Sequence, residues 1–287
     1  ESKSEILDGF GNAPEIARWC LLTLADADEM TEALVSFMTK ESLTYPIVLK
    51  PDIGERGSGV AVIQSQQEAR AYLETAKEAI IAQEYIGGRE YGVFYYRYPN
   101  EREGRVYSIT DKRLISVTGD GVRTLENLVL DDDRAVCMAP FFINQLGVRA
   151  TGVPARGEIV PLTEVGTHCL GALFLNGNQF RTEALRQAID RLSQGYEGFY
   201  FGRYDIRVPS ISDFEAGRNL KVLELNGVTS ESTNIYDPKN GLFSAYRTLF
   251  EQWRIAFEIG AQNRGRGVRP ATVRELWALA TASRRHH

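Results

Sequence analysis

The sequence is poor in cysteine, has no long apolar run and carries no excess of positive charge. Its three cysteines, Cys20, Cys137 and Cys169, form no Cys-x-x-Cys pair, so a zinc site or a disulfide framework is not expected, and free thiols in a reducing cytoplasm are favoured. No apolar stretch approaches the roughly 18 residues that a membrane helix needs. The net charge of -5 argues against non-specific nucleic-acid binding. We therefore expect a cytoplasmic protein without membrane or nucleic-acid partners.

Histidine is equally scarce. His286 and His287 end the chain and resemble the remains of a purification tag, so they are excluded from any site. His168 is the one internal histidine. A catalytic role for it stays open, but a lone histidine without a partner is more often structural.

What the chain does contain is enough apolar sequence for a sizeable core. It has 287 residues, of which 43% are hydrophobic and 25% charged, which suits one large domain or two lobes. Apolar residues at three- and four-residue spacing predict helices at 26–41, 66–78, 123–130, 132–146, 181–194 and 241–260. Apolar or alternating runs predict strands at 45–50, 60–64, 80–86, 91–98 and 105–110. The fold class expected from this mixture is α+β.

Two segments in the second half of the chain place carboxylates beside an arginine. One contains Arg203 and Asp205, and the other contains Glu224 and Asn226, which the period of a strand puts on one face. Carboxylate and amide oxygens are the ligands that Mg²⁺ prefers. The segments therefore predict a magnesium site, although solvated carboxylates on an edge strand would give the same pattern.

A glycine-rich loop joins two apolar runs far upstream. Lys50 ends the first run, and Gly54, Gly57 and Gly59 punctuate the loop. Glycines allow backbone amides to approach an anion closely, and a lysine adds a point charge for a phosphate. The loop is thus a candidate phosphate-binding flap, while an ordinary hairpin turn explains the loop taken alone at least as well.

Together with four further segments, these motifs resemble the ATP-grasp superfamily of ligases, which includes D-alanine-D-alanine ligase, glutathione synthetase and cyanophycin synthetase. The further segments are Ala82-Gln83-Glu84-Tyr85-Ile86, Gly87-Gly88-Arg89-Glu90, the strand with Lys112, and Gly119-Asp120-Gly121-Val122-Arg123-Thr124-Leu125. Gly202-Arg203-Tyr204-Asp205 and Glu224-Leu225-Asn226 match the G-R-x-D and E-x-N motifs of that superfamily. The resemblance implies an ATP-grasp fold in which two α+β lobes enclose the nucleotide.

The resemblance also implies roles for individual residues. ATP would be bound by Lys50, Gly57, Ser58, Gly59, Glu84, Tyr85, Ile86, Glu90 and Lys112. Mg²⁺, or Mn²⁺ in its place, would be held by Asp205, Glu224 and Asn226. Arg203 would be the catalytic residue that faces the reacting carboxylate, and the substrates would be bound by Arg207, Gly227 and Ser230. A turn-capping role for Ser230 is equally consistent with its sequence position.

The same resemblance divides the chain into four segments. Residues 1–22 would connect to the small lobe, 23–86 would form that lobe, 87–265 the large lobe, and 266–287 a C-terminal helix and tag remnant. The Rossmann-like domain that usually precedes the lobes is expected to be absent, so the chain is either a fragment or a shortened member. Lys3 is either an additional phosphate-facing lysine or a solvated tail residue.

The function expected from the resemblance is ATP-dependent ligation of a carboxylate and an amine through an acyl-phosphate, with release of ADP and phosphate. The expected substrates are small molecules, amino acids or peptides by analogy, and a homodimer is compatible with the resemblance. The alternative is a non-catalytic ATP-binding sensor, against which the presence of Arg203, Glu224 and Asn226 argues. A carboxylase or dikinase is disfavoured, because no biotin-attachment or phosphohistidine segment is evident in the sequence.

Overall fold

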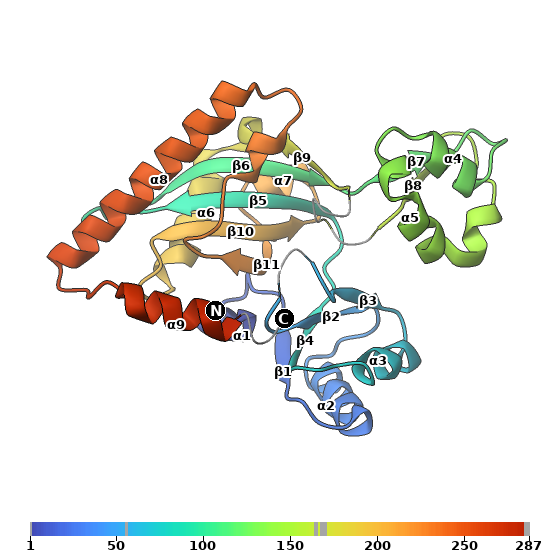
Figure 1. The fold of residues 1–287 in the computed structure, drawn as a ribbon, viewed down its shortest axis with the longest axis horizontal. Helices are drawn as coiled ribbons and strands as arrows, with labels where there is room; N and C mark the ends of the chain where they lie inside the picture. Colours follow the sequence, from blue (N-terminus) through green and yellow to red (C-terminus); the bar gives the residue numbers. More distant parts are fainter. Residues whose placement is uncertain (1, 55–56, 164–165, 167–170, 284–287) are drawn as a thin grey trace.

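The strands of the computed structural model form three antiparallel sheets, and each sheet belongs to a different part of the molecule (Figure 1). The structure describes residues 2–54, 57–163, 166 and 171–283. The α+β class and the two-lobed arrangement around a central space agree with the sequence-based expectation. A third, smaller part was not expected.

The small lobe is a four-stranded sheet with two helices packed on it. Its strands, in spatial order, are β1 (Trp19–Leu22), β4 (Ile80–Glu84), β2 (Ile47–Pro51) and β3 (Ala61–Ile63), and its helices are α2 (Ala27–Lys40) and α3 (Gln66–Leu73). The Asp26 side chain caps α2 by accepting two backbone N–H groups, and Met30, Leu34 and Met38 bury its apolar face. Helix α3 is shorter than the predicted 66–78, because the backbone bonds of the next residues follow a turn, in which Ala76 N–H donates to the Leu73 carbonyl.

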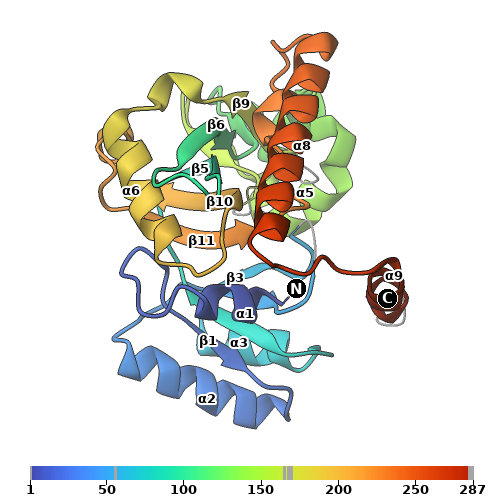
Figure 2. The same cartoon turned by 90° about the vertical axis from the view of Figure 1, so that its left-hand side faces the viewer.

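The large lobe is built on a five-stranded sheet. Its strands, in spatial order, are β11 (Lys221–Asn226), β10 (Phe201–Val208), β5 (Arg89–Tyr96), β6 (Arg105–Arg113) and β9 (Leu173–Asn176). Helices α1 (Lys3–Asp8), α6 (Glu183–Gln194) and α7 (Ile211–Glu215) contribute to the core on one face, and the long helix α8 (Leu242–Gly265) packs on the other. Figure 2 shows α8 running along the outside of this lobe.

Helix α8 covers only part of its face of the sheet, and this leaves room for a site. Phe94 and Phe201 point to α8 and pack against its Ile255 and Ile259. Because side chains of a strand alternate between faces, Arg203 and Asp205 of β10 and Glu90 of β5 share the face of these phenylalanines. They lie where α8 no longer covers the sheet and line a cavity.

The third part contains residues 115–162 and has its own apolar core (Figure 1). Its elements are β7 (Ser116–Thr118), α4 (Leu125–Asp131), α5 (Ala139–Leu146) and β8 (Ile159–Pro161), with short 3₁₀ helices at Ala135–Met138 and Gly147–Thr151. The prediction of one helix over 132–146 was wrong. Pro140 has no backbone N–H to donate to the carbonyl four residues earlier, and the backbone leaves helical geometry at Met138, with φ -130° and ψ 23°, so α5 begins at Ala139.

The two ends of the described chain lie on the same side of the molecule. Helix α9 (Val273–Ser283) falls within the predicted C-terminal helical segment, and Figure 2 shows it standing apart from α1. No helix in the described part of the chain is long and apolar enough to cross a membrane. Cys20 and Cys137 are free thiols, and burial raises the pKa of Cys20 to about 12, while Cys169 lies outside the described residues.

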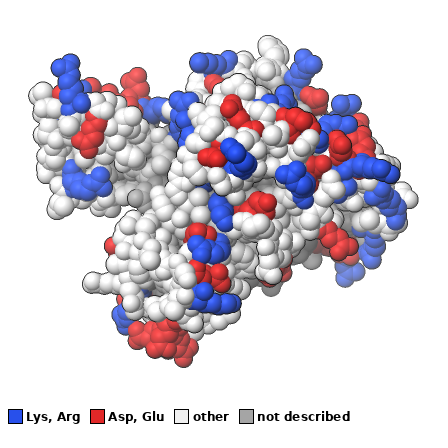
Figure 3. Space-filling view, turned by 180° about the vertical axis from the view of Figure 1, so that it is seen from behind, with Lys and Arg blue, Asp and Glu red and all other residues white. Residues whose placement is uncertain are grey.

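Charged side chains of both signs are interspersed over the face seen in Figure 3. Acidic side chains gather at the bottom of that view, at the end of the small lobe. No basic surface dominates this face.

Candidate active site

A cavity of about 860 Å³ separates the small lobe from the large lobe. Its size falls in the range of small-molecule and cofactor sites. Fourteen of the sixteen residues predicted from the sequence line it: Lys50, Gly57, Ser58, Glu84, Ile86, Glu90, Lys112, Arg203, Asp205, Arg207, Glu224, Asn226, Gly227 and Ser230. Gly59 and Tyr85 are not among the lining residues, although both are next to residues that are. The tertiary structure thus brings together residues that lie up to 180 positions apart in the sequence.

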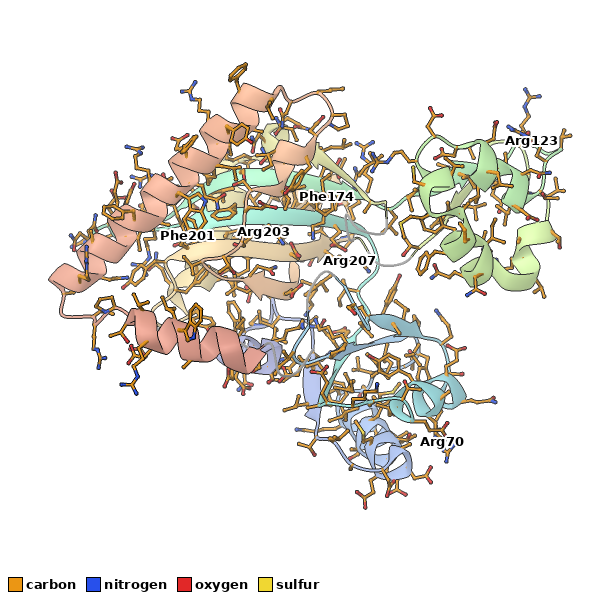
Figure 4. All side chains as sticks on the ribbon, viewed as in Figure 1. Arg70, Arg123, Phe174, Phe201, Arg203 and Arg207 are labelled. Carbon is orange, nitrogen blue, oxygen red and sulfur yellow. The ribbon has the colours of Figure 1, made fainter. Side chains whose placement is uncertain are left out.

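The floor of the cavity is the uncovered face of the large sheet. Asp205 pairs directly with Glu224 across β10 and β11, and Arg203 pairs with Asn226. Cβ atoms of such opposed residues lie about 4.5–5.5 Å apart. The predicted metal ligands and the predicted catalytic arginine therefore form one compact group. Figure 4 shows Arg203 and Arg207 along β10, well apart from the labelled Arg70 and Arg123.

Lys112 lies on this floor between two carboxylates, those of Asp205 and Glu90. Its ammonium Nζ lies 2.9 Å from Oδ2 of Asp205 and 3.0 Å from Oε1 of Glu90. Burial alone would lower the pKa of Lys112, but the two carboxylates outweigh burial and raise it. Burial likewise acts to raise the pKa of Asp205, and the charges of Lys112 and Arg203 outweigh it and lower that pKa. Lys112 and Asp205 are therefore both charged at neutral pH.

Two arginines flank Lys112 on the same face. Arg203 Nε donates to Asp205 Oδ1 at 3.2 Å, and Arg207 Nε donates to Glu90 Oε2 at 3.0 Å. Gly92 of β5 lies between them, and a Cβ there would approach Arg203 Cδ to 3.3 Å. The small residue leaves space for the long basic side chains. The site thus presents three cations, which suits phosphates and carboxylates.

Lys50 connects the small lobe to the metal-site strand. Its Nζ donates to Oε1 of Gln83 at 2.9 Å and to the carbonyl of Leu223 at 3.1 Å. Burial lowers its pKa, and the nearby charge of Glu224 acts in the opposite direction. Gln83 was not singled out as a site residue, although the motif that contains it was recognised. Its role depends on pairing between β2 and β4, which no local pattern reveals.

The glycine-rich flap, which connects β2 to β3 of the small lobe, forms one border of the cavity. Gly54, Gly57 and Ser58 line the cavity, and residues 55–56 lie outside the described part of the chain. Gly57 has a φ of +76°, a conformation that favours glycine. Lys3 also lines the cavity, where its Nζ donates to the carbonyls of Pro51, Asp52 and Gly54 at 3.0–3.2 Å. Lys3 therefore fixes the base of the flap and is not a solvated tail residue.

The hinge between the lobes contains the residues predicted to read the adenine. Glu84 forms a two-pronged ion pair with Arg18, with Arg18 Nη2 at 2.6 Å from Oε1 and Nε at 2.9 Å from Oε2. The Ile86 carbonyl accepts from Arg207 Nη1 at 2.7 Å, and the Tyr85 ring lies 5.7 Å from the Arg207 guanidinium. Arg18 was missed, because no sequence motif links it to a residue 66 positions away. Apolar walls beside the hinge come from Val48, Val62, Ile86, Phe174 and Leu223.

The oxygen donors on β10 and β11 fit a hard divalent cation. Asp205 and Glu224 supply two carboxylates and Asn226 an amide, and magnesium is usually held by one or two carboxylates together with phosphates. Asn226 lines the cavity, and its Nδ2 is buried without a hydrogen-bond partner, so one donor of this amide is unsatisfied. Among the described residues, no three His, Cys, Asp or Glu side chains are arranged so that they could hold a metal ion without other ligands.

The residues predicted to bind substrate lie directly after the metal-site strand. The Ser230 hydroxyl donates to the carbonyls of Gly227 and Asn226 at 2.6 Å and 3.1 Å. This is the turn-capping arrangement that the sequence left open. Gly227 and Ser230 still line the cavity, and their substrate role stays a prediction. His168 lies outside the described residues, so its role stays open too.

Comparisons with known proteins agree with this geometry. The family model of the RimK-like ATP-grasp domain matches residues 22–93, which include most of the small lobe and the hinge. The chain is 31% identical over 109 residues to cyanophycin synthetase from Geminocystis herdmanii (strain PCC 6308), which is 36% of this chain and 11% of that protein. It is 33% identical over 89 residues to cyanophycin synthetase from Trichormus variabilis (strain ATCC 29413 / PCC 7937), or 30% of this chain and 9% of that protein. The chain therefore spans only about a tenth of the length of these relatives.

The solved structure of D-alanine-D-alanine ligase from Bacillus anthracis complexed with ATP has a similar fold. Its TM-score is 0.51 with 15% sequence identity, and the match covers 93% of this chain and 67% of that chain. The predicted resemblance to ATP-grasp ligases and the predicted fold are confirmed.

Proposed function

We propose that this chain, which has the ATP-grasp fold, is an ATP-dependent carboxylate-amine ligase that forms an amide bond and releases ADP and phosphate. One observation chiefly supports the proposal. Lys112, Arg203 and Arg207 meet Asp205 and Glu224 on the floor of a cavity that the glycine-rich flap borders. Cations for phosphates and a carboxylate pair for Mg²⁺ thus occur together.

In the first step, an oxygen of the substrate carboxylate attacks the γ-phosphorus of ATP, the bond to the β,γ-bridging oxygen breaks and ADP leaves. Lys50, Lys112 and the flap amides offset the negative charge of the phosphates. Asp205, Glu224 and Asn226 would hold Mg²⁺, which supplies further charge neutralisation at the phosphates. The apolar residues beside the hinge suit a nucleotide base.

In the second step, an amine attacks the carbonyl carbon of the acyl-phosphate. The new C–N bond forms, the bond between this carbon and the phosphate oxygen breaks, and the amine loses a proton. Arg203 would stabilise the oxyanion of the tetrahedral intermediate, and the loss of such a donor typically costs about 3–4 kcal/mol of barrier. Because Arg203 is held by Asp205, it is preorganised for this role.

The test is an incubation with Mg-ATP and pooled amino acids, dipeptides and small carboxylates, followed by mass spectrometry. A ligase gives substrate-dependent ADP and a product lighter by one water than its two precursors. Arg203→Met should lower product formation by about 100-fold or more and leave ATP binding in place. ATP binding without any substrate-dependent ADP would contradict the proposal and favour the sensor.

A further inference from the structure

Glu231 and Tyr236 line the cavity just beyond the metal-site strand, and no motif assigns them a role. Glu231 lies five positions after Asn226, and Tyr236 ends the 3₁₀ helix Thr233–Tyr236. Both come from the segment that connects β11 to α8. This segment therefore contributes side chains to the same space as the predicted metal site.

Glu231 is fixed beside the predicted catalytic arginine. Arg203 Nη1 donates to the backbone carbonyl of Glu231 at 3.0 Å, and the Tyr236 hydroxyl donates to its Oε1 at 2.5 Å. Burial and the negative charge of Glu231 raise the pKa of Tyr236 to about 12, so the phenol keeps its proton for this bond. Side chain and backbone of Glu231 are thus both restrained.

The segment around Glu231 is anchored on both sides. Gln252 of α8 accepts from Ser232 N–H and donates to the Ser230 carbonyl, each at 2.8 Å. Thr233 shares a hydrogen bond of 2.9 Å with Thr110 of β6. Because Ser232 and Thr233 are buried and bonded to two elements, the backbone at Glu231 is held in place at the cavity wall.

A comparison of the five carboxylates that line the cavity sets Glu231 apart. Glu84 pairs with Arg18, whereas Glu90 and Asp205 pair with the cations of the floor. Glu224 belongs to the predicted metal site. Within the described part of the chain, the Glu231 side chain forms no ion pair, and its carboxylate accepts one hydrogen bond, from the neutral phenol of Tyr236. A restrained carboxylate of this kind suits a cationic ligand.

We propose that Glu231, positioned by Tyr236, binds the ammonium group of the incoming amine beside Arg203. The inference rests on the proposed ligase function and specifies its amine substrate as a primary amine that is protonated in solution, such as the α-amino group of an amino acid. The cations of the floor bind the phosphates and the carboxylate, and Glu231 supplies the opposite charge where the amine enters. The bound ammonium group releases one proton to solvent before its nitrogen attacks the acyl-phosphate. Glu231 is then a specificity residue and Tyr236 a positioning residue.

The test compares two nucleophiles in the presence of Mg-ATP and the carboxylate found in the substrate screen. One is the amino acid amine from the same screen, which arrives as an ammonium ion. The other is hydroxylamine, which is largely neutral at pH 7. It converts an acyl-phosphate to a hydroxamate and needs no protein carboxylate to bind it. Glu231→Gln keeps the size of the side chain and its bond to Tyr236, so it removes only the charge.

We expect Glu231→Gln to raise KM for the amine by about 10- to 100-fold and to leave the rate of hydroxamate formation unchanged. Glu231→Asp should restore part of the amine affinity. Tyr236→Phe should raise KM for the amine by a smaller factor without changing its kcat. Glu32→Gln, on the exposed side of α2, is the matched control and should match the native protein.

An unchanged amine KM in folded Glu231→Gln would overturn the inference, and so would an equal loss of hydroxamate and amide formation, which would place Glu231 in the first step. A native protein that forms neither ADP nor hydroxamate with any carboxylate refutes the ligase function itself. The two failures are therefore distinguishable. Thermal unfolding of each variant checks that it is folded, and Tyr236→Phe gives a second test that leaves the cavity charge unaltered.

Discussion

Asp205 on β10 and Glu224 on β11 face each other directly across two antiparallel strands, yet their carboxylates have different surroundings. Asp205 is buried and bound by both Lys112 and Arg203. Glu224 is half-buried and forms no ion pair with any described residue. The two predicted metal ligands should therefore respond differently to mutation.

Glu224→Gln should abolish activity without affecting the fold. Because the Glu224 carboxylate forms no ion pair with a described residue and acts on Lys50 only through space, we expect the free energy of unfolding to change by about 1 kcal/mol or less. Metal-dependent turnover should fall by about 100-fold or more, since a carboxylate ligand is lost. Urea unfolding and ADP release measure the two effects. Full turnover in this variant would refute the metal assignment.

Asp205→Asn should instead weaken the fold as well as the activity. Removing one charge of a buried pair leaves Lys112 and Arg203 without their shared partner, which typically costs about 3–5 kcal/mol. Urea unfolding without nucleotide should show this loss, with Glu224→Gln as the matched comparison on the neighbouring strand. Equal stability of the two variants would mean that Lys112 does not depend on Asp205.

The Arg18–Glu84 pair at the hinge predicts a pH-dependent stability. Hydrogen bonds from Arg18 hold the pKa of Glu84 below its usual value of 4.5. A carboxyl group with a lowered pKa in the folded state stabilises the fold above its unfolded pKa, and this contribution is lost as the pH falls through the folded pKa. Glu84→Gln should therefore have a lower thermal midpoint than the native protein at pH 7.

The difference between the native protein and Glu84→Gln should shrink as the pH falls below about 4.5. Thermal unfolding scans from pH 7 to pH 3 measure it, and Glu32→Gln on the exposed side of α2 serves as the matched control. A difference that stays constant over this range would show that the ion pair does not stabilise the hinge.

Two adjacent hinge glycines should tolerate alanine very differently. Gly88 has a φ of +101°, and a Cβ there would lie 2.2 Å from the Val208 carbonyl oxygen. Gly88→Ala should therefore cost about 1–3 kcal/mol of stability and weaken ATP binding by shifting the lobes. At Gly87 a Cβ would meet nothing within 4 Å, so Gly87→Ala is the control and should bind ATP normally. Calorimetry and thermal unfolding compare the pair.

Several features of the site follow from local sequence alone. The period of two along β10 and β11 places Arg203 and Asp205, and likewise Glu224 and Asn226, on one face of a strand, and glycines mark the flap. Apolar spacing also located α2, α6 and α8, because an amphipathic helix shows its buried face in its sequence. The four-residue strands β1 and β9 were missed, since runs this short carry little periodic signal.

Other features depend on contacts between residues that are far apart in the chain. The pairing of Lys112 with Asp205, of Arg18 with Glu84 and of Lys50 with Gln83 follows from the register of strands, which no local pattern specifies. The separate core of residues 115–162 and the restraint of Glu231 beside Arg203 are likewise tertiary.

The sequence by itself thus determined which residue types stand at strand ends, turns and helix faces, because these depend on neighbours a few positions away. Only the tertiary structure decided which charges neutralise one another in the cavity and which carboxylates form no ion pair. The reason is physical: the energy of a buried charge depends on the partners that folding brings within about 4 Å, whatever their separation in the sequence.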